Sequence, residues 1–429
     1  MASYPETLDY LFSLHRFGIK LGLEAITDIL ARLGNPQRQY PTLHVAGTNG
    51  KGSSSAMLAS ILQASGYRVG LYTSPHLVDF RERIRVQGTD ISEEWVCALT
   101  EQIRRIADPL TTLTFFEFTT ALAFLHFQNQ QVDMAVVEVG MGGQFDATNV
   151  LSPMGALITG ISFDHEAFLG DSLPKIAREK AGIITQKAPV VLGPMPKEIL
   201  QIFETQAGMW QAPCFRMGQE FFLLEISART FTYQGPRWTL PGLQTNLPGR
   251  HQMVNATNAL AVLEMAVDGT FPVSPSAIRT GLQDVRWRGR LEIVQRNPFL
   301  LLDGAHNLAG AHVLFDFLYS QIHDGAGRQL ILVVGMMRDK NLQGFLRVLI
   351  PLVDHLILTQ PRMERAASVD ELSQAVDRDD LVPCLIADSW EAVCRAKDIA
   401  KPADVICVTG SLFLVGEVLN RLTQPGSRT

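Results

Sequence analysis

Residues 44–54 read His-Val-Ala-Gly-Thr-Asn-Gly-Lys-Gly-Ser-Ser, and this stretch decides the first part of the fold. It joins an apolar run at 43–46 to a stretch of helical period at 53–64, which predicts a glycine-rich turn between a buried strand and a helix. Glycines let backbone N–H groups approach an anion, a helix N-terminus adds partial positive charge, and a lysine supplies a mobile cation. We therefore predict a phosphate-binding loop formed by Gly47, Thr48, Asn49, Gly50, Lys51, Gly52 and Ser53.

The spacing of this loop differs from the general P-loop pattern. Only two residues separate Gly47 from Gly50, and Gly52 stands between Lys51 and Ser53. A glycine-rich turn that binds no ligand therefore stays open as an alternative, although the lysine within the loop argues against it.

Outward from the loop, short β-branched runs alternate with longer stretches of helical period, which is typical of parallel βαβ units. The expected strands are 43–46, 69–73, 134–139, 156–161 and 190–192, and the clearest expected helices are 53–64, 116–127 and 174–184. Residues 214–240 alternate apolar and polar positions and predict a small antiparallel insertion.

A second βα series follows, with expected strands at 300–303, 330–334, 355–358, 382–386 and 405–408. Its length suits one doubly wound, Rossmann-like α/β domain. We place the domain boundary within 287–297, which gives a mainly parallel P-loop domain over 1–289 and a second α/β domain over 290–429.

Length and composition exclude several classes of protein. The chain has 429 residues, enough for two or three domains, and a net charge of −6 without charge blocks, so it is not an electrostatic nucleic-acid binder. Its longest apolar runs, such as 330–337, are too short to span a membrane, and the N-terminus lacks a signal-peptide pattern. We expect a cytoplasmic protein whose five scattered cysteines are buried free thiols.

Three more polar segments end or follow expected strands, so they should meet the loop at one carboxyl edge of the sheet; they are 73–76, 138–143 and 163–166. Glu138 offers a carboxylate to Mg²⁺, and Ser74 and His165 could complete its ligands. Taken alone, each has a plain structural alternative, a capping glutamate or a hydrogen-bonded loop histidine.

The order of nine segments resembles the folylpolyglutamate synthase and dihydrofolate synthase family of the Mur-ligase superfamily. These segments are 47–53, 72–76, 138–143, 146–149, 164–165, 178–183, 289–292, 303–307 and 409–411. The resemblance implies a Mur-ligase-like central domain with a pteroate or folate pocket, followed by a glutamate ligase domain. It also implies a bifunctional ATP-dependent ligase that adds L-glutamate to dihydropteroate or to the γ-carboxyl of folate through an acyl phosphate.

Resemblance also implies the catalytic and metal-binding residues. Lys51 would hold the β- and γ-phosphates of ATP, and Ser74, Glu138 and His165 would bind one Mg²⁺. Lys180 would carry a carbamate derived from CO₂ and bind a second Mg²⁺. The alternative for Lys180 is an exposed helical lysine.

The remaining assignments concern nucleotide and glutamate. By resemblance, Asn255 contacts adenine and Arg290 reaches the phosphates, which makes Arg290 catalytic together with Lys51, Lys180 and His165. Asp303 and His306 would orient ATP or glutamate, and Ser411 would bind glutamate.

The pteroate pocket is implied at Thr114 and Phe116 and at Asp146 and Ala147. The aromatic residues at 115 and 116 also suit a helical core, which stays open. Many bifunctional members carry arginine where this chain has Gln144, so the balance between the two activities is left open.

Three other functions remain as alternatives: a cell-wall Mur ligase, a regulatory P-loop NTPase, and a nucleotide-binding protein with unmodified Lys180. About 40 residues precede the loop, too few for the extra N-terminal domain of cell-wall ligases. We expect a monomer with small-molecule substrates and neither nucleic-acid nor membrane partners.

Overall fold

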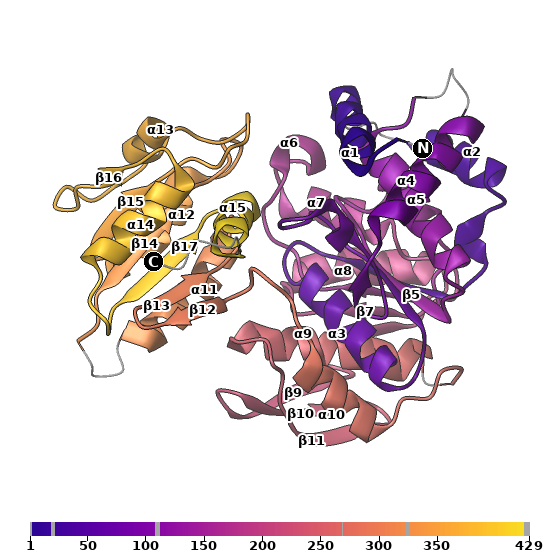
Figure 1. The fold of residues 1–429 in the computed structure, drawn as a ribbon. Helices are drawn as coiled ribbons and strands as arrows, with labels where there is room; N and C mark the ends of the chain where they lie inside the picture. The colour runs from indigo at the N-terminus through magenta and orange to yellow at the C-terminus, as the bar shows by residue number, and fades with distance from the viewer. Residues whose placement is uncertain (1, 19–21, 108–111, 268, 323–326, 424–429) are drawn as a thin grey trace. The chain divides into compact units, whose positions relative to one another are not determined.

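The computed structural model describes residues 2–18, 22–107, 112–267, 269–322 and 327–423. The chain forms two compact units (Figure 1). The first contains residues 1–162, 166–246 and 252–286, and the second contains 163–165, 247–251 and 287–429. The main change of unit along the chain therefore falls between Arg286 and Trp287.

An eight-stranded sheet forms the centre of the first unit, in the order β4-β3-β2-β5-β1-β6-β7-β8. The six strands from β2 to β8 in that order are parallel, and β3 and β4 join antiparallel at one edge. The strands are β1 (Thr42–Ala46), β2 (Val69–Tyr72), β3 (Ile84–Val86), β4 (Thr89–Asp90), β5 (Met134–Glu138), β6 (Gly155–Ile158), β7 (Val190–Leu192) and β8 (Cys214–Arg216). This confirms the mainly parallel α/β domain.

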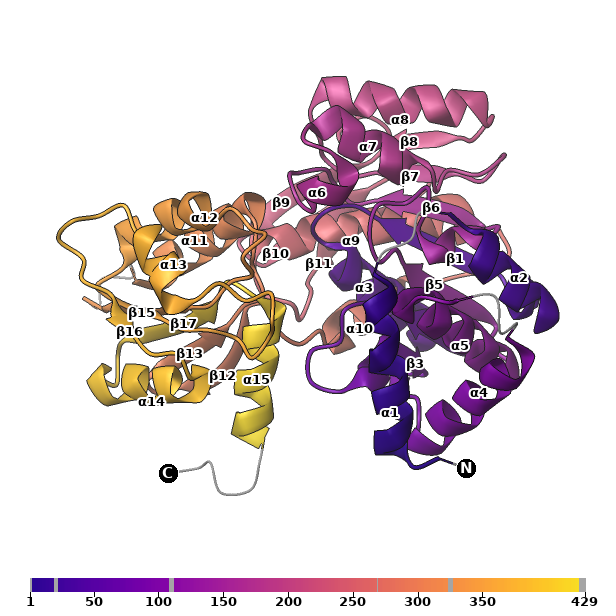
Figure 2. The same ribbon diagram turned by 90° about the horizontal axis from the view of Figure 1, so that it is seen from above.

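Several helices of the first unit pack against this sheet. Figure 2 shows α7 and α8 beside β7 and β8, where their apolar residues bury the sheet. The helices are α1 (Tyr4–Ser13), η1 (Leu14–Phe17), α2 (Glu24–Arg32), η2 (Pro36–Arg38), α3 (Lys51–Ala64), η3 (Phe80–Arg83), α4 (Glu93–Ile106), α5 (Phe115–Asn129), η4 (Ala147–Val150), α6 (Glu166–Leu169), α7 (Leu173–Ala181), α8 (Lys197–Met209), α9 (Arg250–Val262), the π-helix η5 (Leu263–Val267) and α10 (Pro275–Asp284).

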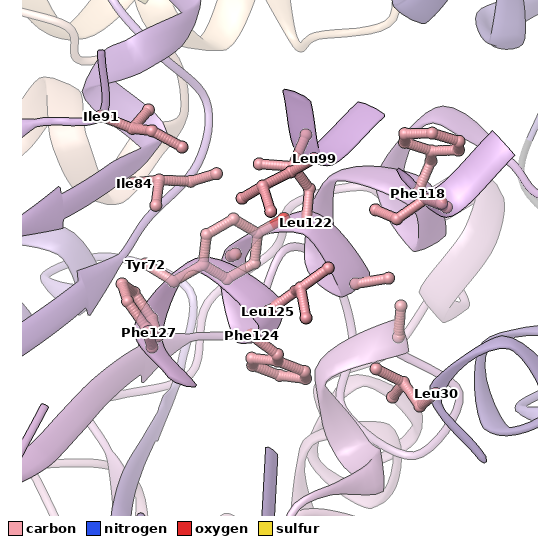
Figure 3. Close-up of a cluster of buried hydrophobic side chains, with 14 of the residues drawn as sticks. Leu30, Tyr72, Ile84, Ile91, Leu99, Phe118, Leu122, Phe124, Leu125 and Phe127 are labelled. Carbon is pink, nitrogen blue, oxygen red and sulfur yellow. The ribbon is translucent and has the colours of Figure 1, made fainter. Parts of the chain in front are cut away.

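The largest aromatic part of the core surrounds α5 (Figure 3). Tyr72 of β2 and Phe118, Phe124 and Phe127 of α5 are each at most 1% exposed. Helices α1, α2 and α4 add leucine and isoleucine side chains to the same cluster. Because α5 is apolar on nearly every side, its sequence shows little amphipathic period, although it lies at the centre of the core.

A small antiparallel sheet follows, but its limits differ from the prediction. It contains β9 (Phe222–Ser227), β10 (Thr230–Gln234) and β11 (Thr239–Leu243), whereas β8 pairs in parallel with β7. The buried Glu264 carboxylate holds the β10–β11 turn by accepting the Tyr233 O–H at 2.5 Å and the Trp238 N–H at 2.8 Å.

The second unit has a six-stranded sheet in the order β12-β13-β17-β14-β15-β16, parallel except for β12. Its elements are β12 (Glu292–Arg296), β13 (Phe299–Leu302), α11 (Leu308–Ile322), β14 (Leu330–Val334), α12 (Leu342–Leu349), η6 (Ile350–Leu352), β15 (His355–Leu358), α13 (Val369–Gln374), β16 (Cys384–Leu385), α14 (Ser389–Ile399), β17 (Val405–Thr409) and α15 (Leu412–Thr423). The Rossmann-like domain is confirmed. The sequence missed β12 because this edge strand is polar and half-exposed.

The cysteines are less buried than composition led us to expect. The expectation of buried cysteines is wrong for four of the five free cysteines, because only Cys407 is buried and Cys384 is exposed. Within the described residues, no helix is both long enough and apolar enough to cross a bilayer.

Candidate functional site

The glycine-rich loop lies between β1 and α3, as predicted, and its conformation requires glycine at two positions. Gly47 has a φ of +140°, and a Cβ there would lie 2.0 Å from Thr159 Oγ1. Gly50 has a φ of +87°, and a Cβ there would lie 2.4 Å from Asn255 Oδ1. The loop and Asn255, expected together at the nucleotide, are therefore direct neighbours in the first unit.

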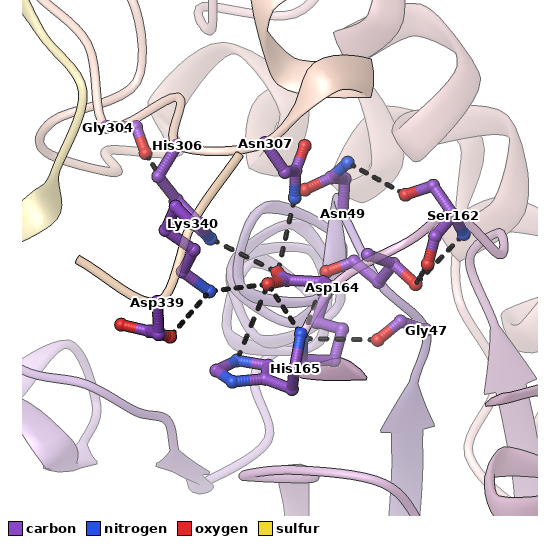
Figure 4. Close-up of polar contacts among 12 residues, drawn as sticks. Gly47, Asn49, Ser162, Asp164, His165, Gly304, His306, Asn307, Asp339 and Lys340 are labelled. Atoms are coloured by element: carbon purple, nitrogen blue, oxygen red, sulfur yellow. Dashed lines mark hydrogen bonds and ion pairs between the residues drawn. The ribbon is translucent and has the colours of Figure 1, made fainter. Parts of the chain in front are cut away.

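The segment after β6 fixes the shape of this loop (Figure 4). The Thr48 N–H donates to Gly160 O at 2.8 Å, and the Thr159 hydroxyl donates to Asn49 O at 2.6 Å. The Thr48 hydroxyl donates to Ser162 O and accepts the Ser162 N–H, both at 3.1 Å. Sequence reasoning missed residues 159–162 as loop partners, although their place after a neighbouring parallel strand was a signal.

The loop and the first turn of α3 have the features that suit an anion. In the described structure no side chain caps the N-terminus of α3, whose first turn contains Lys51, Gly52 and the buried Ser53. Uncapped first-turn N–H groups and the helix dipole attract phosphate. The Lys51 ammonium group rests on the loop itself, donating to Gly47 O and Thr48 O at 3.2 Å each.

Ser74 and Glu138 come together because β2 and β5 are neighbours. Glu138 ends β5 and is 4% exposed, and one of its carboxylate oxygens accepts the Ser74 N–H at 3.2 Å. Among the described residues, no group of three histidine, cysteine, aspartate or glutamate side chains forms a metal site. A magnesium site at Glu138 therefore needs oxygen ligands from elsewhere, such as a hydroxyl, a phosphate or a modified lysine.

Lys180 is buried in the last turn of α7, with 3% of its surface exposed, so the alternative of an exposed helical lysine is wrong. The loop after Glu138 packs on this turn so closely that a Cβ on Gly143 would lie 2.9 Å from Lys180 Cα. Burial of an ammonium group is costly, whereas a carbamate would turn this side chain into an anionic oxygen ligand. The residues present thus suit the group that the resemblance implies.

Asp164 is the centre of a polar cluster in the second unit (Figure 4). It pairs with Lys340 Nζ at 2.5 Å, accepts from Asn307 Nδ2 at 3.2 Å and lies 3.3 Å from His306 Nε2. Burial opposes ionisation, but the hydrogen bond from His306 and the charges of His306, His165 and Lys340 hold the pKa of Asp164 well below its usual range. Sequence reasoning missed Lys340, which gave no signal beyond its polar context.

His165 is held next to this cluster by its own backbone. Its φ is +52°, and its N–H donates to Asp164 Oδ1 at 2.9 Å. Its side chain is 39% exposed. His306 is likewise fixed, because its Nδ1 lies 2.8 Å from Gly304 O while Nε2 contacts Asp164. The structure thus joins His165 and His306 through one carboxylate.

Arg290 and Asp303 also lie together in the second unit. The buried Asp303 carboxylate accepts the N–H groups of Leu291 and Ala305 at 2.9 Å each, which fixes the bend after Arg290. Burial raises the pKa of Asp303, and the Arg290 charge opposes that rise. Both carboxylate oxygens accept backbone N–H groups, so Asp303 has a structural role in holding the segment that follows Arg290.

Two proposed substrate residues are helix caps. Ser411 Oγ accepts the Phe413 N–H at 3.0 Å at the start of α15. Thr114 caps α5 in a reciprocal capping box, in which the Glu117 carboxylate accepts the Thr114 N–H and hydroxyl at 2.8 Å each. Phe116, in the first turn of α5, lies against Gly140, where a Cβ would be 2.4 Å from its ring. Phe116 therefore touches the loop that follows Glu138.

A buried hydrogen-bonded chain holds Asp146, with Ala147 buried beside it. Asp146 accepts the Thr148 hydroxyl at 2.5 Å and the Met141 N–H at 2.9 Å, and His44 Nε2 lies 2.8 Å from the same hydroxyl. Burial lowers the pKa of His44 to about 3, so its ring is neutral. Neutral His44 thus donates to Thr148, which donates to Asp146. Sequence reasoning missed His44, although a histidine within a buried strand was a signal.

Replacing Thr148 by valine should destabilise the protein, because His44 Nε2 and Asp146 Oδ1 would lose their shared buried partner. We expect Thr148→Val to lower the free energy of unfolding by about 1–3 kcal/mol in urea denaturation. Thr100→Val is the matched control, because the buried Thr100 hydroxyl has no partner among the described residues. Equal losses in the two variants would contradict the relay.

Comparison with known proteins defines first the class of protein. The Mur ligase middle domain matches residues 45–263, and the Mur ligase glutamate ligase domain matches residues 289–412. The fold, the phosphate loop and both matches make the chain a ligase of the Mur type.

Individual similar proteins then identify the family within this class of ligases. The dihydrofolate synthase/folylpolyglutamate synthase of Bacillus subtilis is 32% identical over 98% of this chain and 99% of its own length. The Escherichia coli protein of the same name is 34% identical over 96% of this chain and 94% of its own. The structure of Escherichia coli FolC in complex with DHPP and ADP has a TM-score of 0.89 at 32% identity and covers 98% of both chains. This chain belongs to the dihydrofolate synthase/folylpolyglutamate synthase family of ATP-dependent glutamate ligases.

Proposed function

We propose that this chain joins L-glutamate to dihydropteroate and to the γ-carboxyl of a folate, at the expense of ATP. The observation that carries the proposal is the match to this family over 98% of the chain, supported by the glycine-rich loop at the uncapped start of α3 and by the Ser74–Glu138 contact. Related structures hold the corresponding ligands: DHPP and ADP in the Escherichia coli protein, AMPPNP and Mn in the Yersinia pestis protein, and Mn, AMPPNP and L-glutamate in a further bifunctional folylpolyglutamate synthase/dihydrofolate synthase.

Amide formation from a carboxylate requires activation of the acid. An oxygen of the substrate carboxylate attacks the γ-phosphorus of ATP, ADP leaves, and an acyl phosphate forms. The amino group of glutamate then attacks the acyl carbon, loses a proton, and phosphate leaves with the bond to carbon broken. Several anions meet in the first step, so positioned cations and N–H donors do most of the catalytic work.

Each domain has its own part in this reaction. We assign ATP and pteroate binding to residues 1–289, where the loop, Lys51 and Asn255 receive the nucleotide and Phe116 and Asp146 receive the pterin. We assign glutamate binding to residues 290–429, where Arg290 contacts the phosphates and His306 and Ser411 orient the amino acid.

We also assign the metal ligands. Ser74, Glu138 and His165 would hold one Mg²⁺, and carbamylated Lys180 would hold a second. When bound, magnesium supplies charge neutralisation at the phosphate oxygens. The burial of Lys180 and Glu138 and the Ser74–Glu138 contact support this assignment.

A substrate assay tests the function. Purified protein with ATP, Mg²⁺ and labelled glutamate should incorporate label when given dihydropteroate in one reaction and tetrahydrofolate in another. Label in only one product would show a single activity, which the exposed Gln144 would help to explain. A regulatory NTPase would instead hydrolyse ATP rapidly without the acid and glutamate, and that result would contradict the proposal.

Monomeric state and cytoplasmic location stay predictions from the sequence. Light scattering of the eluting protein should give a mass near the 47.4 kDa of one chain.

A further inference from the structure

Arg83 is a buried cation that the proposed mechanism does not use. It ends η3 and is only 7% exposed. Its Nε–H donates to His76 Nδ1 at 2.8 Å, and the guanidinium carbon lies 5.1 Å from the ring centre of Phe115. Among the described residues, neither Nη atom has a hydrogen-bond partner and no carboxylate pairs with Arg83 within 4 Å. A buried charge with unpaired donors is costly unless a ligand completes it.

Nearby charged groups do not supply that partner. His76 accepts the Arg83 Nε–H through Nδ1, so its ring brings no negative charge to the guanidinium. Glu138 and Glu82 act on Arg83 electrostatically. The Glu82 carboxylate is already occupied, because it accepts the N–H groups of residues 77–79 at 2.7–3.1 Å.

Aromatic rings surround the guanidinium. Phe115 stacks on His15 with ring centres 4.1 Å apart, and Phe80 and Phe12 lie 6.2 and 5.9 Å from Phe115. These rings come from α1, η1, η3 and the start of α5. Phe12 is 38% exposed, so the cluster reaches the surface of the first unit. Flat rings beside a fixed cation suit an aromatic carboxylate.

We infer that Arg83 receives the carboxylate of the acid substrate before that acid is phosphorylated. The inference rests on the proposed function, which requires an aromatic acid to lie near the phosphate loop. Phe115 stands between the pocket residues Thr114 and Phe116, and Glu138 is the proposed magnesium ligand. Arg83 adjoins the Phe115 ring and lies within electrostatic reach of Glu138. Its two Nη–H groups would donate to the two carboxylate oxygens, the paired geometry in which arginine binds carboxylates most strongly.

A pair of ligands that differ only in the carboxylate tests this role. Dihydropteroate and its analogue without the carboxylate are titrated into the full chain with AMPPNP and Mg²⁺, and the ratio of the two dissociation constants is recorded by calorimetry. We expect the wild-type protein to prefer the acid and Arg83→Met to reduce that preference about 10- to 100-fold. Because the ratio is taken within each variant, a general weakening of the pocket cancels.

Arg81 on the same short helix provides the matched control. It is about one-third exposed and pairs with Asp79 at 2.8 Å, so Arg81→Met should leave the ratio unchanged. Arg83→Lys keeps the positive charge but loses the paired N–H groups of the guanidinium, so it should reduce the ratio several-fold. This variant tests the inference even if Arg83→Met does not fold.

Three results would overturn the inference. They are an unchanged ratio in Arg83→Met, an unchanged ratio in Arg83→Lys, and a fall in AMPPNP affinity with the ratio intact, which would assign Arg83 to a nucleotide phosphate. Failure of the proposed function has a different signature. In that case the wild-type protein would prefer the acid yet form no amide with ATP and glutamate.

Discussion

Lys180→Ala is expected to lower amide synthesis at least about 10³-fold, because it removes the anionic oxygen ligand proposed for the second magnesium ion. The lysine is 3% exposed in the last turn of α7, beside the loop that follows Glu138. The measurement is the rate of label incorporation at saturating ATP, dihydropteroate and glutamate. The chain should still unfold cooperatively, since the apolar contacts of α7 with the sheet remain.

Lys175→Ala controls for a change in α7 itself. Lys175 lies on the same helix, but it is exposed and pairs with Asp171 at 2.9 Å, so this variant should keep wild-type activity. Carbamylation has its own readout, because protein equilibrated with ¹³CO₂ should show a carbamate NMR signal that Lys180→Ala lacks. Wild-type turnover in Lys180→Ala would refute the metal role, and the same ¹³C spectrum in both proteins would refute the modification.

Local pattern explains which parts of the fold and site were predictable. The phosphate loop was predictable because a glycine-rich turn follows a buried strand. The contact of Ser74 with Glu138 was predictable because parallel strands bring their carboxyl ends together at one edge of the sheet. Strand β12 was missed because edge strands need little apolar pattern. The sheet order, with β17 at the centre of the second sheet, depends on long-range pairing that the sequence does not display.

The other features of the site depend on tertiary contacts between residues that are far apart in the sequence. The sequence left an exposed position for Lys180 as an alternative, because the burial of this lysine depends on packing by a loop far along the chain. The Asp164 cluster could not be predicted because it joins residues more than 140 positions apart. The capping box at Thr114 was readable, since threonine followed three residues later by glutamate marks a helix start. Thr114 therefore has a structural role as a helix cap in addition to its proposed contact with substrate. Phe116 is linked more directly to the loop that follows Glu138.

Lys51→Ala should abolish ATP turnover, with nucleotide affinity lowered by about 10²–10³-fold, because the loop loses its one mobile cation while its N–H donors remain. Among the described residues, the ammonium group donates hydrogen bonds only to the loop carbonyls of Gly47 and Thr48, at 3.2 Å each. Its removal should therefore change the free energy of unfolding by no more than about 1 kcal/mol. Nucleotide titration and urea denaturation of the same preparation measure both quantities.

Gly50→Ala separates loss of charge from loss of shape. A Cβ at this residue meets Asn255 Oδ1 at 2.4 Å and the backbone has a φ of +87°, so Gly50→Ala should lose both nucleotide affinity and stability. Lys51→Ala should lose only the first, because the hydrogen bonds of Thr48 and Asn49 to the segment after β6 keep the loop in place. ADP release by Lys51→Ala at the wild-type rate would show that the loop binds nucleotide without its lysine, and the proposed phosphate contact would then be wrong.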